Sequence, residues 1–239
     1  MRWIVGDVHG CAREVDDLLR EVCFDAGRDE LWCVGDYVNR GPDSAAAVRL
    51  FRDAGAFGVL GNHDLYVLAV REGKTPRNGD NLDPFFAAPD VDESLEWLAR
   101  LPGMAYVAAT DETPALWIVH AGLDPRWGDL HDVARRLAGP QTGGRLVDPD
   151  LTFAANVRCC SATGQRCRHT GVPEGCPAPF EPWDSFYRGD TLVVHGHWAV
   201  RGHYRGERTL GLDSGCVHGG RLTAWCHEED RIVQVRSRG

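Results

Sequence analysis

The stretch RWIVGDVHG, residues 2–10, joins a short apolar run directly to a cluster of polar residues. Residues 3–5 have the aromatic and β-branched character of a buried strand. Gly6 then allows the backbone to turn sharply where the strand ends, which aims the side chain of Asp7 away from the strand. The stretch therefore predicts a strand whose carboxyl end carries functional side chains.

The same junction occurs five times along the chain, always with an apolar run that stops at a glycine or a histidine. The junctions are RWIV before GDVHG (2–10), LWCV before GDYVNRG (31–41), GVL before GNHD (58–64), LWIV before HAG (116–122) and TLVV before HGHW (191–198). Helix-like segments at 12–20, 44–53 and 64–72 follow the first three junctions, which indicates βαβ connections and a largely parallel sheet. Such sheets bind ligands beyond the carboxyl ends of their strands, so the five polar clusters are predicted to meet at one edge.

The polar side chains at these junctions are carboxylates, an amide and imidazoles. They are Asp7, His9, Asp36, Asn62, His63, Asp64, His120, His195 and His197. Such donors bind borderline to hard divalent cations. Each motif alone is more often a polar turn, but together they favour two ions, because six or seven candidate ligands surround one central aspartate. Asp7 and His9 are two residues apart, which places them on one face of an extended segment and allows both to hold one ion.

Composition limits the other classes of function. A chain of 239 residues with 43% hydrophobic content can bury one full core, so we expect a single α/β domain over residues 1–239. The formal charge of -9 argues against a broad surface for nucleic acid or membrane. Nine irregularly spaced cysteines indicate reduced thiols. No export signal or membrane span is apparent, so we expect a cytoplasmic protein.

In order, the motifs GDVHGC, GDYVNRGPDS, GNHD, HAG and HGHW resemble those of the calcineurin-like metallophosphoesterases, over residues 6–197. The resemblance implies an α/β fold of four layers, an αββα sandwich in which helices flank two packed β-sheets. Two branches of the superfamily compete, namely the phosphoprotein phosphatases and the bacterial symmetrical diadenosine tetraphosphatases.

The resemblance also implies how two divalent ions would be held. One ion would take Asp7, His9 and Asp36, and the other would take Asp36, Asn62, His120 and His197. Asp36 would then bridge the pair. Manganese is the expected metal, and cobalt, iron, nickel and zinc are alternatives, because oxygen and imidazole donors accept several ions.

Other positions match groups that face the substrate. His63 matches the family's proton donor to the leaving group, and Arg40 matches its phosphate clamp, for which a bidentate guanidinium is well suited. Arg158 matches a basic residue that faces the substrate, whereas Asn156 stands where a second arginine is expected. For His195 two interpretations stay open: a residue that faces the substrate or supports the ligands, and a hydrogen-bonded histidine of the core.

Asn39 bears on the choice of branch. Phosphoprotein phosphatases typically carry Asp at this position, and that carboxylate keeps the catalytic histidine protonated. An amide can orient His63 but cannot raise its pKa by charge. A nucleoside diphosphate leaves more easily than a serine alkoxide, because its charge is spread over phosphate oxygens. Asn39, Asp64 of GNHD and the stretch LDSGCVHGGRLTAW at 212–225 therefore favour the tetraphosphatase branch.

The leading hypothesis is a hydrolase that cleaves a symmetrical dinucleoside tetraphosphate, such as diadenosine tetraphosphate, into two nucleoside diphosphates. His63, Asp64 and Asn39 would be catalytic, and Arg40, Arg158 and His195 would face the substrate. The same chemistry would remove nucleoside-tetraphosphate caps from RNA 5′ ends. The alternative is a protein Ser/Thr/Tyr phosphatase, and a catalytically inactive metal-binding protein is a third possibility. Base preference, the native metal pair and oligomeric state stay open.

Residues 139–182 are rich in Gly, Pro, Cys and Arg and show little periodicity, which is typical of loops. We expect them to form a cap beside the metals. Within this cap, Cys160, Cys167, His169 and Cys176 are candidate ligands of a structural zinc ion. No close CxxC pair is present, so ordinary reduced thiols are favoured.

Overall fold

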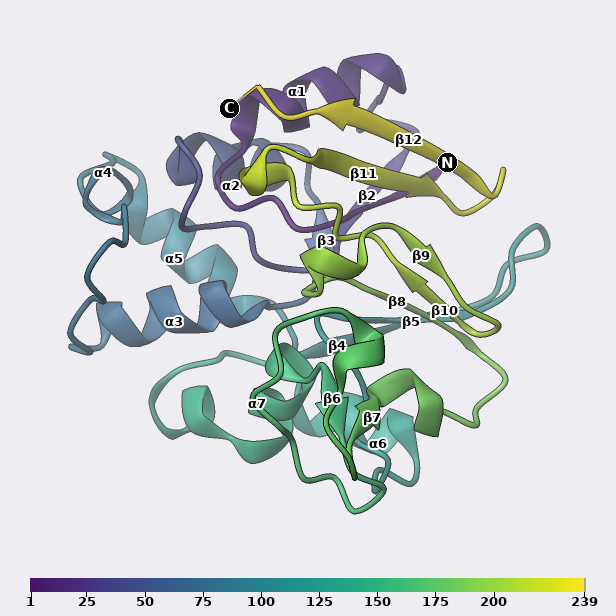
Figure 1. The fold of residues 1–239 in the computed structure, drawn as a ribbon. Coiled ribbons are helices and arrows are strands. Elements are labelled where there is room, and N and C mark those ends of the chain that lie inside the picture. Colours follow the sequence, from purple (N-terminus) through teal and green to yellow (C-terminus); the bar gives the residue numbers. More distant parts are fainter. Residues whose placement is uncertain (239) are drawn as a thin grey trace.

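Two β-sheets pack face to face, with helices on both outer faces (Figure 1). This computed structural model describes residues 1–238. The first sheet has the strand order β12-β11-β1-β2-β3. Its strands are β1 (Arg2–Val5), β2 (Glu30–Cys33), β3 (Phe57–Gly58), β11 (Arg221–Cys226) and β12 (Arg231–Arg236). The expected four-layer αββα sandwich is therefore confirmed.

The second sheet has the order β4-β5-β8-β10-β9. Its strands are β4 (Met104–Val107), β5 (Leu116–Val119), β8 (Leu192–His195), β9 (Tyr204–Arg205) and β10 (Thr209–Gly211). Both sheets contain parallel pairs, β1 with β2 and β2 with β3 in the first, and β5 with β8 and β8 with β10 in the second. In the first sheet, β11 pairs antiparallel with β1. The parallel connections expected from the first three junctions are confirmed, although β3 is only two residues long.

The helices come from the segments between these strands. They are α1 (Ala12–Glu21), α2 (Ser44–Asp53), α3 (Asn62–Arg71), α4 (Asp83–Phe86), α5 (Val91–Arg100), α6 (Leu130–Arg136) and α7 (Pro149–Asn156). Short 3-10 helices occur at Gly143–Val147, Pro173–Gly175, Trp183–Phe186, Ala199–Arg201 and Cys216–His218. Within residues 1–238, every helix is too short or too polar to span a lipid bilayer.

Alternation along each strand divides the core in two. Ile4 of β1 packs between the sheets in one cluster with Ile118 of β5 and Val194 of β8. Its neighbours Trp3 and Val5 point to the other face and join the larger cluster beneath the helices. Each fully buried aliphatic side chain of this kind contributes about 1.5–3 kcal/mol to stability. This two-sided burial fixes the register of the strands and therefore the positions at which their polar ends emerge.

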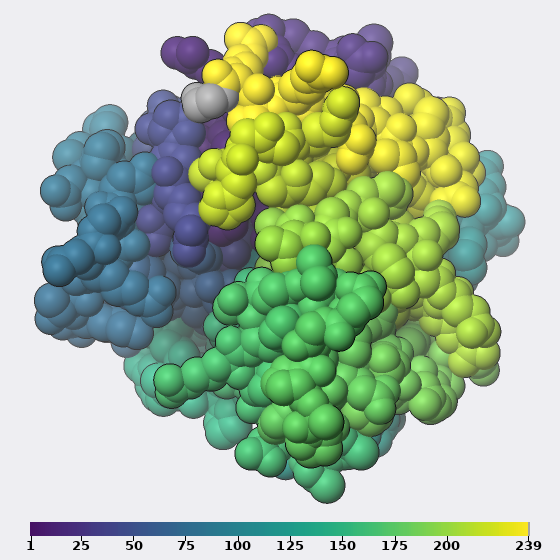
Figure 2. Space-filling model, viewed as in Figure 1, coloured from purple at the N-terminus to yellow at the C-terminus, as the bar shows by residue number. Residues whose placement is uncertain are grey.

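The segment 139–182 packs against the second sheet beside α6, in green in Figure 1. It contains α7 and a two-stranded sheet of β6 (Cys159–Cys160) and β7 (Glu181–Pro182). The backbone N–H of Ala121, just beyond β5, donates to the carbonyl of Ala154 in α7 at 2.7 Å. In the space-filling view, the green surface of this segment stands forward next to the yellow-green surface of the later strands (Figure 2).

The cysteines differ from the expectation in one respect. Cys159 and Cys176 form a disulfide within this segment, whereas the sequence predicted reduced thiols throughout. The other seven cysteines are free. The prediction was wrong for this pair because the pairing of β6 and the course of the following loop, which bring the two side chains together, leave no regular spacing in the sequence.

Candidate metal centre

Backbone strain is concentrated at the predicted site. Seven non-glycine residues among 1–238 have positive φ, a conformation that costs free energy for residues with a Cβ. Five of them come from the polar clusters: His9 (47°), Asp36 (57°), Asn39 (73°), Arg40 (71°) and His197 (70°). Such strain persists only where the surrounding structure enforces it, so this edge of the sheets is built for a purpose other than stability.

Two glycines make room for the carboxylates of the site. A Cβ atom added to Gly196 would lie 1.9 Å from Oδ1 of Asp7, and one added to Gly61 would lie 2.1 Å from Oδ1 of Asp36. Real Cβ atoms never approach so closely. Because they lack a Cβ, Gly196 and Gly61 allow the backbone to pack directly against the carboxylates of Asp7 and Asp36.

Asp36 lies where two groups of side chains meet. Its Oδ2 atom is 3.4 Å from Nε2 of His9 and 3.3 Å from Nε2 of His120. The donor atoms of Asp36, His9 and His63 all lie within 4.8 Å of one another. The same is true of Asp36, His120 and His197. One carboxylate thus belongs to both clusters, as a bridging ligand must.

Asp7 and Asn62 extend the two clusters. Oδ2 of Asp7 lies 3.9 Å from Nε2 of His9, and both of its oxygens accept from the backbone N–H of His197 at 3.1 Å. Oδ1 of Asn62 lies 3.2 Å from Nε2 of His120. The structure therefore brings together the six side chains predicted as ligands. That they bind cations stays a prediction.

The electrostatics of the clusters fit divalent cations. Burial raises the pKa of Asp7 well above its usual range, and the nearby charge of Asp213 raises this pKa further. Burial lowers the pKa of His9 to about 4, which leaves its imidazole neutral and able to bind a metal. Carboxylates buried side by side are unfavourable unless positive charge compensates them. Burial lowers the pKa of His120, but the charges of Asp36 and Asp7 raise it to about 10, so this ring must lose a proton when a cation binds. Carboxylate, amide and imidazole donors suit manganese, iron, cobalt, nickel or zinc.

Asp213 was not predicted as part of the site. It is buried near Asp7, whose pKa its charge raises, and it accepts from the backbone N–H of Gly215 at 3.0 Å. The signal in the sequence was LDSG at the start of residues 212–225, a stretch that we used only to choose between the two branches. The aspartate faces the centre because β10 ends beside β8 in the same sheet.

His63 lies at the edge of the clusters, within reach of Arg40. Nε of Arg40 donates to Nε2 of His63 at 3.3 Å, and the ring of His63 stands edge-on to that of His9. Burial lowers the pKa of His63. Its Nδ1 atom is buried and has no hydrogen-bond partner among the described residues. A buried polar atom without a partner is costly, which favours a ligand at this position.

Asn39 contacts other groups than expected. Its Nδ2 donates to Oδ1 of Asp80 at 3.1 Å, and its Oδ1 accepts from the backbone N–H of Arg40 at 2.7 Å. Within residues 1–238 the amide makes no hydrogen bond to His63, so the prediction that Asn39 orients this ring directly was wrong. Asp80 comes from a stretch with no motif, and the sequence offered no signal for it.

Asp64 acts through the backbone. Its two carboxylate oxygens accept from the N–H groups of Gly61 and Asp36 at 2.8 Å and of Tyr37 at 2.9 Å. Among the described residues it makes no side-chain hydrogen bond to His63. Asp64 therefore fixes the loop that carries Asp36 to the first turn of α3, which carries His63, and positions both groups indirectly.

Arg158 approaches the clusters from the cap. One terminal N–H of its guanidinium group donates to the carbonyl of His197 at 3.1 Å. Its Nε is buried and has no hydrogen-bond partner among the described residues. Arg158 lines a pocket of about 530 Å3 together with Asn156, Arg166 and Arg168. Several guanidinium groups around one hollow favour an anionic ligand. Arg166 and Arg168 were missed because an arginine in a loop carries no local signal of its direction.

His195 is placed apart from the clusters. Its side chain is 1% exposed and stands edge-on to Trp183, and its Nδ1 lies 3.1 Å from the carbonyl of Gly196. Burial lowers its pKa to about 4. This is the environment of the core histidine, one of the two interpretations that the sequence left open. A direct contact with substrate finds no support in this geometry.

Known proteins are similar to this chain over nearly its whole length. Residues 2–213 match the family model described as calcineurin-like phosphoesterase. The chain is 36% identical to the symmetrical bis(5′-nucleosyl)-tetraphosphatase of Thioalkalivibrio sulfidiphilus, with 92% of this chain and 93% of that protein covered. It is 35% identical to the protein of the same name from Proteus mirabilis, with 96% and 95% covered.

A solved structure agrees with these relatives. A crystal structure assigned to a diadenosine tetraphosphatase has a TM-score of 0.74 to this chain and 33% sequence identity, and it covers 100% of this chain and 94% of its own. The family match spans both clusters and the strands that carry them. The chain belongs to the calcineurin-like phosphoesterase family, whose members are metal-dependent hydrolases.

Proposed function

We propose that the protein hydrolyses symmetrical dinucleoside tetraphosphates and releases two nucleoside diphosphates, two ADP from diadenosine tetraphosphate. The convergence of buried oxygen and imidazole donors on Asp36 carries this proposal. Relatives that share 35–36% of their residues over nearly the whole chain are named for this reaction. The basic pocket beside the clusters supplies a place for a polyphosphate chain.

Two divalent ions fit the donor set. We assign Asp7, His9 and Asp36 to one ion, and Asp36, Asn62, His120 and His197 to the other. When bound, such a pair neutralises charge on the phosphate oxygens and lowers the pKa of the attacking water. We retain manganese as the expected metal. The sequence and the donor geometry accept cobalt, iron, nickel and zinc as well.

The chain's own groups bind the substrate and move the proton. Arg40 and Arg158 hold phosphate oxygens through charge-assisted hydrogen bonds, which are about twice as strong as neutral ones. His63 donates the proton to the nucleoside diphosphate that departs. The contact between Arg40 and His63 keeps the phosphate clamp and the acid side by side, so that binding brings the leaving oxygen to the acid.

The pocket lined by Arg158, Arg166 and Arg168 would hold the departing half of the substrate. Symmetrical cleavage requires the second phosphorus of four to lie at the clusters, with the remaining two phosphates extending to one side. A pocket of about 530 Å3 with three guanidinium groups is suited to that nucleoside diphosphate. The same grip on a terminus would accept a nucleoside-tetraphosphate cap of RNA, without the broad basic surface that the net charge of -9 excludes.

The organisation of the chain follows from this assignment. We propose one metallophosphoesterase domain over residues 1–239, in which the cap at 139–182 contributes Arg158 and the basic pocket. We also retain the cytoplasm as its location, where dinucleoside polyphosphates and their diphosphate products would be available. In this scheme the two clusters that share Asp36 take all of their donors from this chain.

Product analysis tests the proposal. The protein is incubated with manganese or cobalt and with either diadenosine tetraphosphate or a phosphopeptide, and the products are separated by chromatography. We expect ADP as the sole nucleotide product and slower turnover of the peptide. The formation of ATP plus AMP would contradict symmetrical cleavage. Faster release of phosphate from the peptide would favour a protein phosphatase instead.

A further inference from the structure

We propose that the cap holds a structural zinc ion through Cys159, Cys167, His169 and Cys176. This site is separate from the clusters around Asp36, and its donors are sulfur and imidazole instead of oxygen. Three cysteines and one histidine form a closed tetrahedral zinc site in many small domains.

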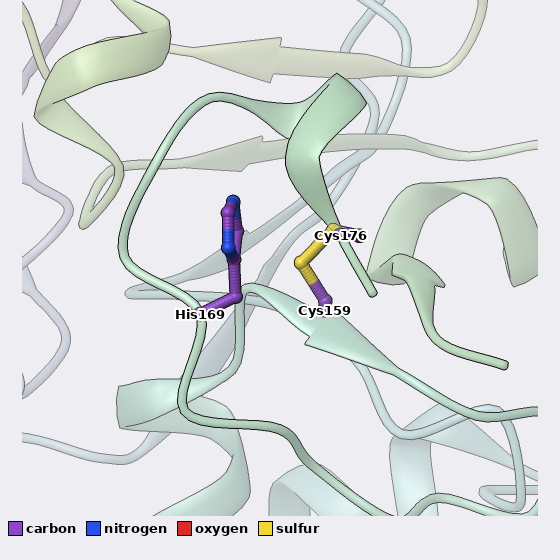
Figure 3. A group of neighbouring side chains, drawn as sticks. All are labelled: Cys159, His169 and Cys176. Carbon is purple, nitrogen blue, oxygen red and sulfur yellow. A yellow bond between two sulfur atoms is a disulfide. The ribbon is translucent and has the colours of Figure 1, made fainter. Parts of the chain in front are cut away.

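Three of the four side chains already meet. Cys159 belongs to β6, and Cys176 follows the 3-10 helix Pro173–Gly175. Their Cα atoms are 6.0 Å apart, and their sulfur atoms are bonded. The ring of His169 stands beside the sulfur pair (Figure 3), and the donor atoms of all three residues lie within 4.8 Å of one another. Once the bond between Cys159 and Cys176 is reduced, their two sulfur atoms can move apart and bind one ion together with His169.

The sulfur of Cys167 lies outside the group of donor atoms within 4.8 Å of one another, and the backbone register is what points to Cys167 as the fourth ligand. Cys160 and Arg166 form an antiparallel bridge, and the N–H of Cys167 donates to the carbonyl of Cys159 at 3.1 Å. Cys159 and Cys167 are therefore paired across the strands, and paired side chains point to the same face. Cys160 points to the opposite face and is fully buried. The set considered from the sequence is thereby corrected, with Cys159 in place of Cys160.

The loop around His169 is shaped to hold an imidazole. Nε2 of His169 donates to the carbonyl of Val172 at 2.8 Å, so Nδ1 is the ring nitrogen that is left to bind a cation. Cβ atoms added to Gly171 and Gly175 would lie 3.0 Å and 2.9 Å from Cε1 of His169. The two glycines therefore let the loop wrap closely around the ring.

Residues 161–182 need a cross-link to become ordered. Between residues 161 and 182, Gly164 is the one buried position. A stretch that buries so little apolar surface cannot offset the entropy of ordering it, and metal ions or disulfides commonly do so. In a reducing cytoplasm disulfides are rare, and the same cysteines then act as metal ligands. The localisation proposed above thus favours the metal.

The two states differ by a balanced reaction. Two equivalents of a thiol reductant convert the bond between Cys159 and Cys176 into two thiols and are themselves oxidised to a disulfide. Zinc then displaces the protons of the three thiols and binds the thiolates together with neutral His169. Arg166 and Arg168 flank Cys167 and line the basic pocket, so the ion would also fix their positions.

Cobalt provides the test, since thiolate ligands give it a charge-transfer absorption that oxygen and imidazole ligands do not. The full-length protein, reduced with a phosphine or thiol and loaded with Co2+, is compared with the C159S/C176S and C167S variants. We expect the thiolate band in the parent protein, its loss in the double variant and a weaker band in C167S. Elemental analysis of zinc-loaded protein should show about one ion fewer per chain in the double variant.

Cys23 is free and exposed, so Cys23→Ser serves as the matched control and should leave the band unchanged. A band that survives in C159S/C176S would belong to other thiols, such as buried Cys11 and Cys216, and would overturn the proposal. The proposal would also be overturned if the parent protein, with its reduced thiols verified by alkylation, gave no band. If the double variant does not fold, His169→Ala is tested in its place. A weaker or lost band in His169→Ala supports the proposal, and an unchanged band overturns it. The readout is independent of tetraphosphate hydrolysis, so failure of either proposal is recognised separately.

Discussion

The side-chain amide of Asn39 donates a hydrogen bond to Asp80 at 3.1 Å, across a sequence separation of 41 residues. Asp80 also accepts from the hydroxyl of Tyr66 at 2.5 Å and from the backbone N–H of Arg77 at 2.9 Å. The amide therefore anchors the loop before α4 to the turn that carries Arg40. A carboxylate at position 39 would face Asp80, which gives a local reason for an amide there.

The exchange Asn39→Asp should therefore weaken the protein. A second carboxylate beside Asp80 replaces a donor by a like charge, and we expect a loss of about 1–3 kcal/mol in the free energy of unfolding. The double variant N39D/D80N restores one donor and one acceptor and should recover most of the loss. Urea unfolding of the two single variants and the double variant measures this coupling. Equal stability of N39D and N39D/D80N would contradict it.

If His63 is the proton donor, its removal should lower the rate and leave metal binding unchanged. His63→Ala is expected to lower kcat for diadenosine tetraphosphate about 10²–10⁴-fold, as for loss of a general acid. Its metal content should match that of the parent protein, because the substitution changes none of the six proposed ligands. His218→Ala, at an exposed position, is the control. A kcat within twofold of the parent protein would exclude His63 as the acid.

Asp36 and Asp7 should differ in their effect on metal binding. Asp36 lies in both clusters, so Asp36→Asn is expected to weaken the binding of two ions per chain. Asp7 lies beside His9 alone among the imidazoles of the donor set, so Asp7→Asn is expected to weaken the binding of one. Titration with Mn2+ followed by elemental analysis distinguishes the two. Identical stoichiometries for both variants would argue against a bridging role.

Arg158 tests the basic pocket. Arg158→Ala should raise KM for diadenosine tetraphosphate about 10–100-fold, as expected from the loss of one or two charge-assisted hydrogen bonds. Lysine keeps the charge but lacks the planar pair of donors, so the KM of Arg158→Lys should lie between those of the parent protein and Arg158→Ala. Arg100→Ala, an exposed arginine on α5, should change nothing. Steady-state kinetics of the parent protein and the three variants measure these effects. If Arg158 has a purely structural role, Arg158→Ala and Arg158→Lys should raise KM equally.

The contrast between Asn62 and Asp80 shows how far the sequence predicts this site. Asn62 follows an apolar run and a glycine, so local pattern alone places it at the edge where the strands end. Asp80 sits in a polar loop and reaches Asn39 through packing between distant segments, which no local pattern encodes. The pairing of Cys159 with Cys176 is missed for the same reason. Strand ends are thus predictable from sequence, while the loops that converge on them are not.

Gly196 shows that space is as necessary as donors. Gly196→Ala places a methyl group where Oδ1 of Asp7 lies, because the added atom would be 1.9 Å from it. The carboxylate must turn away from His9, so we expect weaker metal binding and a large loss of activity that excess manganese partly restores. Gly128 has open space around an added Cβ, and Gly128→Ala should behave like the parent protein. Full metal affinity in Gly196→Ala would mean that Asp7 is not held against this glycine in solution.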